Sequence, residues 1–461
     1  MPSSAPSKAR HLCVLIHGLW GNANHLNYVA DSIRDRFSED QLVVYSAKKN
    51  TGSLTYDGIE IGAERVAREI EDLLEELARD EIRVDKFSIV GYSLGGLVAR
   101  FVVGLLDHKG YLDRMTAVNF VTFATPHLGV RSPLLGYHNQ VWNVLGARTL
   151  SQSGRELFMI DDFRQTGRPL LSVLADPDSI FIRALAKFQT RCLYANVVND
   201  RSAVFYTTAI SKYDPYVYMD RLRLRYVKDY EPVVLDPEQP FDKLPQQDLP
   251  TLYDRLRSKG QTLLRRIPFV IVLGILIPIA LVGFLVNSAI QTLRSQRRIR
   301  LHEKDEQGPG RGDRIPLFVE NMRVGLEGAF EHVNSSQEQD YLPEGSEELV
   351  DVAPSSLSLS SPPPSPPLSR RQSTVNLLSS TEKATAATTG ERPHDSLPTL
   401  ALTPAQFAAI KSLDDVGFRK FHVYIHKSSH SHAAIIVRMP RAAFEEGKLV
   451  VKHWLEKEFK L

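Results

Sequence analysis

Ser93 lies between two glycines in the segment 84–100, VDKFSIVGYSLGGLVAR, which gives the spacing G-x-S-x-G. An apolar run at residues 87–90 predicts a short strand before the turn, and the apolar periodicity after it predicts a helix. Gly91 and Gly95 remove the Cβ atoms that would collide as strand and helix close up. A serine held in such a turn, above a helix N-terminus, is placed to attack an acyl carbonyl. We therefore predict a nucleophile at Ser93; the alternative is a glycine-rich turn that only packs.

Two backbone N–H groups are expected to stabilise the oxyanion that such an attack creates. One belongs to Leu94, directly after the nucleophile. The other would come from the turn HGLWG, which follows an apolar strand expected at residues 12–16. Its donor would be Leu19, with Trp20 as the alternative. We expect the side chain of His17 to brace this loop, because the chemistry needs only the backbone.

A serine nucleophile of this kind needs a carboxylate and then a histidine, in the chain order Ser, acid, His. Asp200 follows an apolar strand expected at residues 191–198, and it would hold the tautomer of the histidine; Asp214 is the rival acid. His432, at the end of the polar turn SSHSH, is the best candidate for the general base, and His430 is second. His127 precedes the acid, so we expect it to shape the pocket wall.

Strands and helices alternate around these residues, which predicts a mostly parallel sheet with right-handed crossovers. Further strands are expected at residues 42–45, 118–122 and 418–425. Helices are expected at 24–37, at 62–79, from the strand–turn–helix bend at Ser93 (the elbow) to about 106, and at 442–459. Residues 131–187 show no sheet pattern. They are either helices packed on the sheet or a lid over an acyl-chain pocket.

The composition excludes several classes of protein. The 461 residues carry a formal charge of +2, so no overall field points to nucleic acid. Cys13 and Cys192 both lie in apolar runs and are expected to be buried thiols, which fits a reducing compartment. The first ten residues, MPSSAPSKAR, contain no apolar stretch, so we expect no cleavable signal peptide.

Residues 267–290 are apolar without a formal charge, and arginines flank them on both sides. A straight helix of this length could cross a hydrocarbon core of about 30 Å. However, if His432 is the base, the flanks must lie on the same side of the membrane, together with Ser93 and Asp200. Pro278 lies near the middle, and two arms of about 15 Å would fit a hairpin in one leaflet. We therefore predict a monotopic hairpin, compatible with the single phospholipid layer of a lipid droplet.

The composition changes again in residues 301–400, where Ser/Pro-rich and Thr/Ala-rich stretches predict disorder. We therefore expect the following organisation along the chain. A disordered N-terminus (1–10) precedes the first part of the core (11–230) with its insertion at 131–187; the membrane segment with its basic flanks (265–300), the disordered insertion (301–400) and the second part of the core (401–461) follow.

The motifs HGLWG, GYSLGG, FATPHLGVR and NVVNDRSAVFY together resemble the putative serine esterase family of lipase-like α/β-hydrolases. More narrowly, they are similar to its fungal members, which include a phospholipase of lipid droplets. The resemblance covers about residues 12–218 and resumes near 418–459. It implies an α/β-hydrolase fold and a serine hydrolase acting on acyl esters of lipids, with no metal or organic cofactor.

The resemblance and the predicted hairpin together indicate lipid partners and a cellular location. The substrate would be a phospholipid or an acylglycerol at a membrane or droplet surface. The expected location is the lipid droplet or the endoplasmic reticulum membrane, with the catalytic domain facing the cytosol. A mono- or diacylglycerol lipase and an acyltransferase on the same residues are the alternatives, and an inactive membrane adaptor is the alternative of another class.

Overall fold

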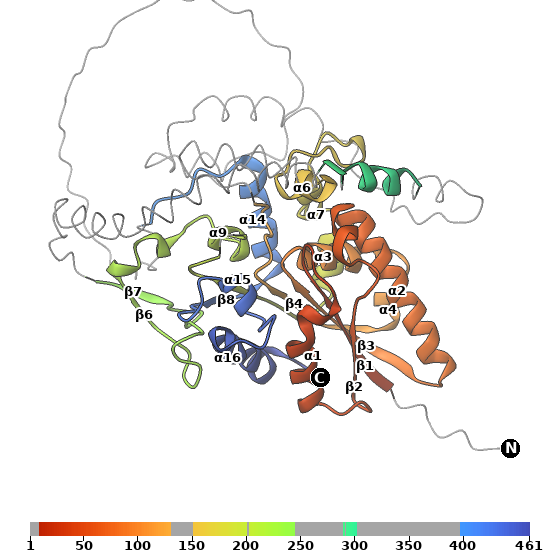
Figure 1. Ribbon diagram of the computed structural model, residues 1–461, viewed down its shortest axis with the longest axis horizontal. Helices are drawn as coiled ribbons and strands as arrows, with labels where there is room; N and C mark the ends of the chain where they lie inside the picture. Colours follow the sequence, from red (N-terminus) through yellow and green to blue (C-terminus); the bar gives the residue numbers. More distant parts are fainter. Residues whose placement is uncertain (1–8, 131–150, 201, 245–288, 291, 302–396) are drawn as a thin grey trace, which may run out of the picture.

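The computed structural model describes residues 9–130, 151–200, 202–244, 289–290, 292–301 and 397–461 (Figure 1). Its centre is a six-stranded sheet in the order β2-β1-β3-β4-β5-β8. All neighbouring strands run parallel. The strands are β1 (Ala9–Ile16), β2 (Leu42–Ser46), β3 (Arg83–Tyr92), β4 (Thr116–Phe123), β5 (Thr190–Asn196) and β8 (Arg419–Val423).

Helices cover both faces of this sheet. Successive side chains of a strand point to opposite faces, and in these strands apolar side chains on both faces must be buried. In β1, Leu12 and Val14 join the hydrophobic cluster on one face, whereas Cys13 and Leu15 join the cluster on the other. The first face is covered by α2 (Ile59–Arg79), α3 (Leu94–His108), α7 (Leu170–Leu174), α8 (Ile180–Ala186) and α14 (Pro404–Val416). The second is covered by α1 (Asn27–Arg36), α15 (Ser431–Ala434) and α16 (Glu446–His453). This layering is the predicted α/β architecture.

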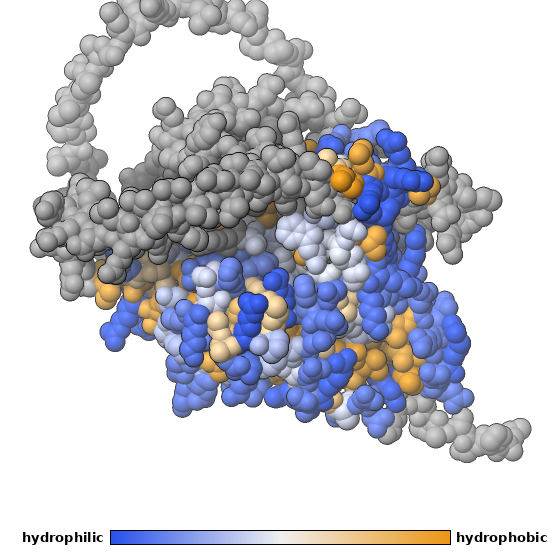
Figure 2. All heavy atoms as spheres, in the orientation of Figure 1, coloured by the Kyte–Doolittle hydropathy of each residue, from blue (hydrophilic) through white to orange (hydrophobic). Residues whose placement is uncertain are grey.

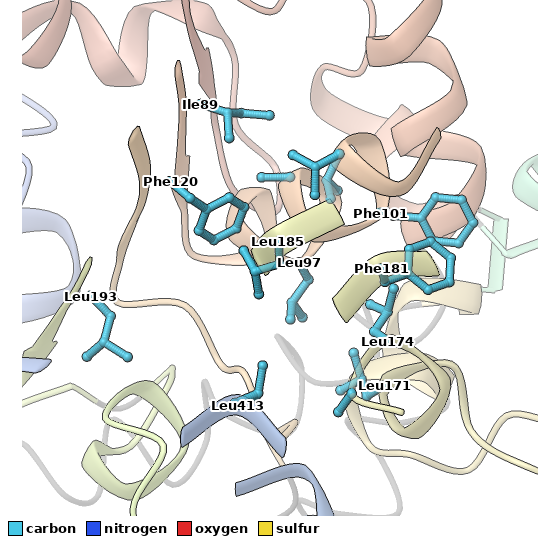
Figure 3. Packing of buried hydrophobic residues seen from close by; sticks show 14 of the residues in the cluster. Ile89, Leu97, Phe101, Phe120, Leu171, Leu174, Phe181, Leu185, Leu193 and Leu413 are labelled. Carbon is cyan, nitrogen blue, oxygen red and sulfur yellow. The ribbon is translucent and has the colours of Figure 1, made fainter. Parts of the chain in front are cut away.

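The helices that follow the unassigned stretch belong to the core. Phe181 of α8 packs on Phe101 of α3, with ring centroids 4.8 Å apart, and Leu171 and Leu174 of α7 lie close by (Figure 3). In the described part of the insertion, from residue 151 onward, α8 therefore packs against α3, and α7 packs against α6 and α14. Its first part, residues 131–150, lies outside the described residues.

The six predicted strands are confirmed, with ends that differ by a few residues. Two predicted helices are interrupted. The helix expected at 24–37 begins as a 3-10 turn, η1 (Ala23–Leu26), capped by the side chain of Asn22, and α1 follows because Leu26 leaves helical geometry. The helix expected at 442–459 is divided into η5 (Ala442–Phe444), α16 and a wider final turn, η6 (Trp454–Glu458), in which buried Trp454 packs against Phe459.

Short elements complete the described chain. They are η2 (Gly52–Tyr56), α4 (Tyr111–Arg114), α6 (Ser151–Leu157), η3 (Phe163–Gln165), α9 (Phe205–Thr208), η4 (Pro215–Arg221), β6 (Leu222–Leu224) and β7 (Phe241–Lys243). Cys13 and Cys192 are buried in β1 and β5, as predicted, and burial raises the pKa of the Cys13 thiol to about 12.

The C-terminal segment returns to the sheet that the first part of the chain forms. β8 pairs with β5 in parallel register, from Cys192 opposite Arg419 to Asn196 opposite Val423. The candidate histidine, which follows β8, is therefore brought to the same end of the sheet as the Ser93 turn, where the parallel strands have their carboxyl ends. Among the described residues, no helix is both long and apolar enough to cross a membrane. The predicted hairpin at 267–290, apart from its last two residues, lies outside them, as does nearly all of the insertion at 301–400.

Candidate active site

Ser93 occupies a sharp turn between β3 and α3. Its backbone has φ 54° and ψ −128°, a region that residues with a side chain rarely adopt. A Cβ on Gly91 would lie 2.3 Å from the Cα of Gly96, and one on Gly95 would lie 2.2 Å from the carbonyl oxygen of Ile16. Only glycine fits at both places. The two glycines of G-x-S-x-G are therefore required by the close packing that holds Ser93 in its strained turn.

The structure brings Ser93, His432 and Asp200 into one chain of hydrogen bonds. The Nε2 atom of His432 lies 2.9 Å from the Ser93 hydroxyl oxygen, and its Nδ1 atom lies 2.8 Å from Asp200 Oδ2. The other carboxylate oxygen of Asp200 accepts from the backbone N–H groups of Ser202 and Ala203, at 3.1 and 2.9 Å. With Oδ2 also accepting from Asn196, at 3.0 Å, the carboxylate is fully hydrogen-bonded. This arrangement fixes Asp200 so that it can orient the imidazole.

His432 is held from its backbone as well as from its ring. It lies in α15, where the hydroxyl of Ser431 donates to the carbonyl of Val198 at 2.8 Å. The hydroxyl of Tyr92 donates to the carbonyl of His432 at 3.0 Å, and the two rings lie 5.2 Å apart. Tyr92 is the residue directly before the nucleophile. Sequence reasoning missed this contact, because the variable position of G-x-S-x-G carries no signal about its partner.

The rival residues lie elsewhere. The carboxylate of Asp214 caps η4 by accepting from the N–H of Tyr216, and burial raises its pKa to about 6. His430 is exposed, two residues before His432. His127 is completely buried, its ring bonds Thr122 at 3.0 Å, and burial places its pKa well below the ordinary value. The structure therefore joins none of the three to the Ser93 hydroxyl, and His127 supports the turn after β4.

The candidate oxyanion donors lie on either side of the nucleophile. Leu94 is the first residue of α3, and the first N–H groups of a helix have no partner within it. A Cβ on Gly18 would lie 2.7 Å from the Cβ of Ser93, so the loop that carries Leu19 packs directly against the nucleophile. The N–H of Trp20 already donates to Thr55 at 3.0 Å, which favours Leu19 as the second donor. These two roles remain a prediction.

His17 braces the same loop, as expected. Its side chain is buried, and its Nδ1 atom lies 3.0 Å from the carbonyl oxygen of Gly18. Desolvation lowers its pKa, which keeps the ring neutral. Within the described parts of the chain, no group of three or more His, Cys, Asp or Glu side chains is placed to hold a metal ion.

Comparison with known proteins gives fungal relatives that are described as putative lipases. The chain is 28% identical over 247 residues to "Putative lipase ROG1" of Saccharomyces cerevisiae, covering 52% of this chain and 34% of that protein. It is 30% identical over 214 residues to "Putative lipase C4A8.10" of Schizosaccharomyces pombe, covering 45% of this chain and 27% of the relative. The chain thus spans about a third of the length of the curated relatives that it matches.

Solved structures give weaker likenesses. An extracellular α/β-hydrolase from a Paenibacillus species matches with a TM-score of 0.21 and 21% identity, over 29% of this chain and 50% of that one. The phospholipase PlaB from Legionella pneumophila matches with a TM-score of 0.28 and 14% identity, over 43% of this chain and 40% of that one. Scores this low support no argument, so the fold rests on the sheet order and the elbow described above.

The match to a family model covers the elbow, the loop with Leu19 and the loop with Asp200. It extends over residues 6–212 and is described as "Putative serine esterase (DUF676)". Its span includes the motifs HGLWG, GYSLGG, FATPHLGVR and NVVNDRSAVFY, and the matched relatives are described as putative lipases. Over residues 6–212, this chain is therefore similar to the putative serine esterase family.

Proposed function

We propose that this protein is a serine hydrolase that cleaves acyl esters of glycerophospholipids at a lipid surface. One observation carries the proposal: the continuous hydrogen-bonded chain from the Ser93 hydroxyl through His432 to Asp200, built on a strained elbow. Residues in these positions have one well-defined chemistry, which is acyl transfer through a covalent intermediate. Among acyl esters of lipids, we propose glycerophospholipids as the substrate.

The first half-reaction follows from the geometry. His432 Nε2, 2.9 Å from the hydroxyl oxygen, takes the proton of Ser93 as the oxygen attacks the ester carbonyl. Asp200 keeps the proton of Nδ1 in place and stabilises the imidazolium that forms. The N–H groups of Leu94 and Leu19 donate to the developing oxyanion. The imidazolium then gives its proton to the leaving alkoxide, and the acyl group remains on Ser93.

The second half-reaction uses the same groups in reverse. A water molecule attacks the acyl-enzyme, His432 takes its proton, and the free fatty acid leaves while Ser93 regains its hydrogen. Without the nucleophile only residual activity should remain. The loss of one oxyanion donor would lower the rate by about 10²- to 10³-fold.

Attachment to a lipid surface through a hairpin at residues 267–290 is part of the proposal. Both flanks of the surrounding segment pack on the catalytic domain: the N–H of Leu244 donates to Arg221, and Arg298 pairs with Asp57 on both carboxylate oxygens. A single membrane crossing would separate these flanks, whereas a hairpin returns the chain to the same side. Figure 2 shows a few apolar residues among hydrophilic ones at the upper right of the described surface. Two apolar side chains, Ile160 and Leu293, are 50% and 68% exposed.

The test is hydrolysis by purified protein of mixed emulsions of phospholipid and neutral lipid, followed by separation of the products. We expect fatty acid and lysophospholipid from wild type and no turnover above background from Ser93→Ala or His432→Ala. His108→Ala, a change of an exposed histidine at the end of α3, should behave as wild type.

Three outcomes would contradict the proposal. Wild-type activity in Ser93→Ala would exclude this nucleophile. Full activity in His432→Ala with loss in His430→Ala would reassign the base. Consumption of neutral lipid alone would retain the hydrolase but exclude phospholipid as its substrate.

A further inference from the structure

A cavity of about 250 Å³ opens beside His432. Its walls come from three loops: the one that carries Asp200, the polar turn before α15, and the turn between α15 and η5. The residues that line it are Asn199, Ser202, Ser429, His430, His432, Ala433, Arg438, Met439, Arg441 and Phe444.

The position of this cavity relates it to one part of an ester substrate. In the proposed mechanism, the imidazolium of His432 gives its proton to the leaving alkoxide. The leaving group therefore lies on the histidine side of Ser93, while the acyl chain stays attached to the serine. Because His432 forms part of the cavity wall, the cavity lies where the alcohol portion of the substrate would sit.

The charges of the cavity favour an anion. Arg438 and Arg441 both line it, and none of the residues that form its wall is acidic. Within the described parts of the chain, neither arginine has an ion-pair partner, although Arg438 is hydrogen-bonded to Tyr92. The guanidinium groups of Arg438 and Arg441, beside the hydroxyls of Ser202 and Ser429, supply the donors that recognise a phosphate.

The arginines are fixed to the same short segment as the candidate base. Val437 has φ 52°, a conformation that a β-branched residue rarely adopts, and it turns the chain directly before Arg438. The N–H of Arg438 donates to the carbonyl of Ala433 at 3.0 Å, which closes the turn onto α15. A phosphate bound by this turn would thus be held at a defined place relative to His432.

We propose that this cavity is an anion subsite, in which Arg438 and Arg441 bind the phosphate of the leaving group of a glycerophospholipid. The inference rests on the proposed function and adds the residues that select phosphate-bearing esters over neutral ones. In that role both arginines are specificity-determining residues, and they take no part in the bond-breaking step.

The test compares two short-chain substrates that differ only in the phosphate, each kept monomeric: dihexanoylphosphatidic acid and dihexanoylglycerol. The measured quantity is the ratio of their kcat/KM values. Because a hydrogen bond to a charged group is lost, Arg441→Gln and Arg438→Gln should each lower this ratio by about 10- to 100-fold. Lys427→Gln removes the same charge from an exposed position close to the loop and should leave the ratio unchanged.

Other results would overturn the inference. An equal fall for both substrates would mean that the arginines only support the loop of His432. An unchanged ratio would mean that no phosphate binds there. If the ratio is unchanged and the variants instead lose binding to vesicles of phosphatidylcholine with phosphatidylserine, the arginines bind the membrane surface and not the substrate.

A binding measurement separates this inference from the proposed function. Calorimetry with the Ser93→Ala protein should detect glycerol 3-phosphate, and adding Arg441→Gln should weaken its binding at least tenfold. If wild type hydrolyses neither ester while this binding is found, the proposed function fails and the subsite stands. If esters are hydrolysed but glycerol 3-phosphate does not bind, or inorganic phosphate binds more tightly, the assignment to the lipid phosphate is wrong.

Discussion

The substitution Asp200→Asn tests the acid at the site without changing the shape of its side chain. Asp200 Oδ1 accepts from two backbone N–H groups, and Oδ2 faces His432 Nδ1 and Asn196. If the amide oxygen of the variant stays with the backbone donors, its NH₂ group faces His432. Nδ1 must then accept, so the proton moves to Nε2, and the ring can no longer take the proton of Ser93.

The opposite orientation of the amide keeps the correct tautomer but is costly. It would leave two buried N–H donors facing an NH₂ group, at about 1–3 kcal/mol each. A total cost of about 2–6 kcal/mol would limit the fraction of molecules that keep the proton on His432 Nδ1 to between about one in 30 and one in 10⁴. The unproductive orientation costs less, because the amide of Asn196 can turn its own oxygen, which has no hydrogen-bond partner, toward the variant.

We therefore expect Asp200→Asn to lower kcat/KM by about 10³- to 10⁴-fold when the loss of the carboxylate charge is included. The assay is hydrolysis of 4-nitrophenyl butyrate at neutral pH, with a melting curve to show that the variant is folded. Asp214→Asn is the matched control, since that side chain caps η4 away from the histidine, and it should retain activity within a few-fold. A loss below tenfold in Asp200→Asn, or a large loss in the control, would refute the assignment.

Three further predictions concern the elements around the site. Gly95→Ala would place a Cβ 2.2 Å from the carbonyl oxygen of Ile16, so it should lower the free energy of unfolding in urea by at least about 2 kcal/mol and abolish ester hydrolysis. A free energy of unfolding within about 0.5 kcal/mol of wild type, which is typical of surface substitutions, would argue against this packing. The fully buried carboxylate of Asp57 forms ion pairs with Arg65 and Arg298. Asp57→Ala should therefore lower the free energy of unfolding by about 3–5 kcal/mol, measured in urea. A decrease under about 1 kcal/mol would contradict this role of Asp57. Burial raises the pKa of Glu156 from 4.5 to about 8, so between these pH values the native state binds one proton more than the unfolded state, and the free energy of unfolding falls as pH rises. The melting temperature of Glu156→Gln should not show this fall between pH 4.5 and about 8. A variant with the same pH profile as wild type would contradict the prediction.

The sequence predicted the sheet well because its central strands are short apolar runs between turn signals, and a buried parallel strand has that pattern. It also predicted Ser93, Asp200 and His432 as partners, because the chain order of nucleophile, acid and base leaves few candidates. Helix interruptions were less predictable. Leu26 and Trp454 are apolar residues at helical spacing, and their departure from the regular helix depends on packing that the pattern does not contain.

Contacts between distant loops were beyond sequence reasoning. Tyr92 and His432 are 340 residues apart, and Arg298 and Asp57 are 241 apart, so neither pair has a local signature. The preference for Leu19 over Trp20 became visible only through the bond from Trp20 to Thr55. The two arginines of the proposed anion subsite were also unpredictable, because the segment RMPRAAF (residues 438–444) has the pattern of an ordinary loop and only the structure shows that both arginines line one cavity.

The central claim is that Ser93 is an activated nucleophile. Its most direct test is the reaction of the purified protein with a fluorophosphonate probe, followed by mass spectrometry of the intact protein and of its peptides. We predict one adduct, on the peptide that contains Ser93, and no adduct in Ser93→Ala; labelling should also be far slower in His432→Ala. An unlabelled wild type, or an adduct that persists in Ser93→Ala, would contradict the account.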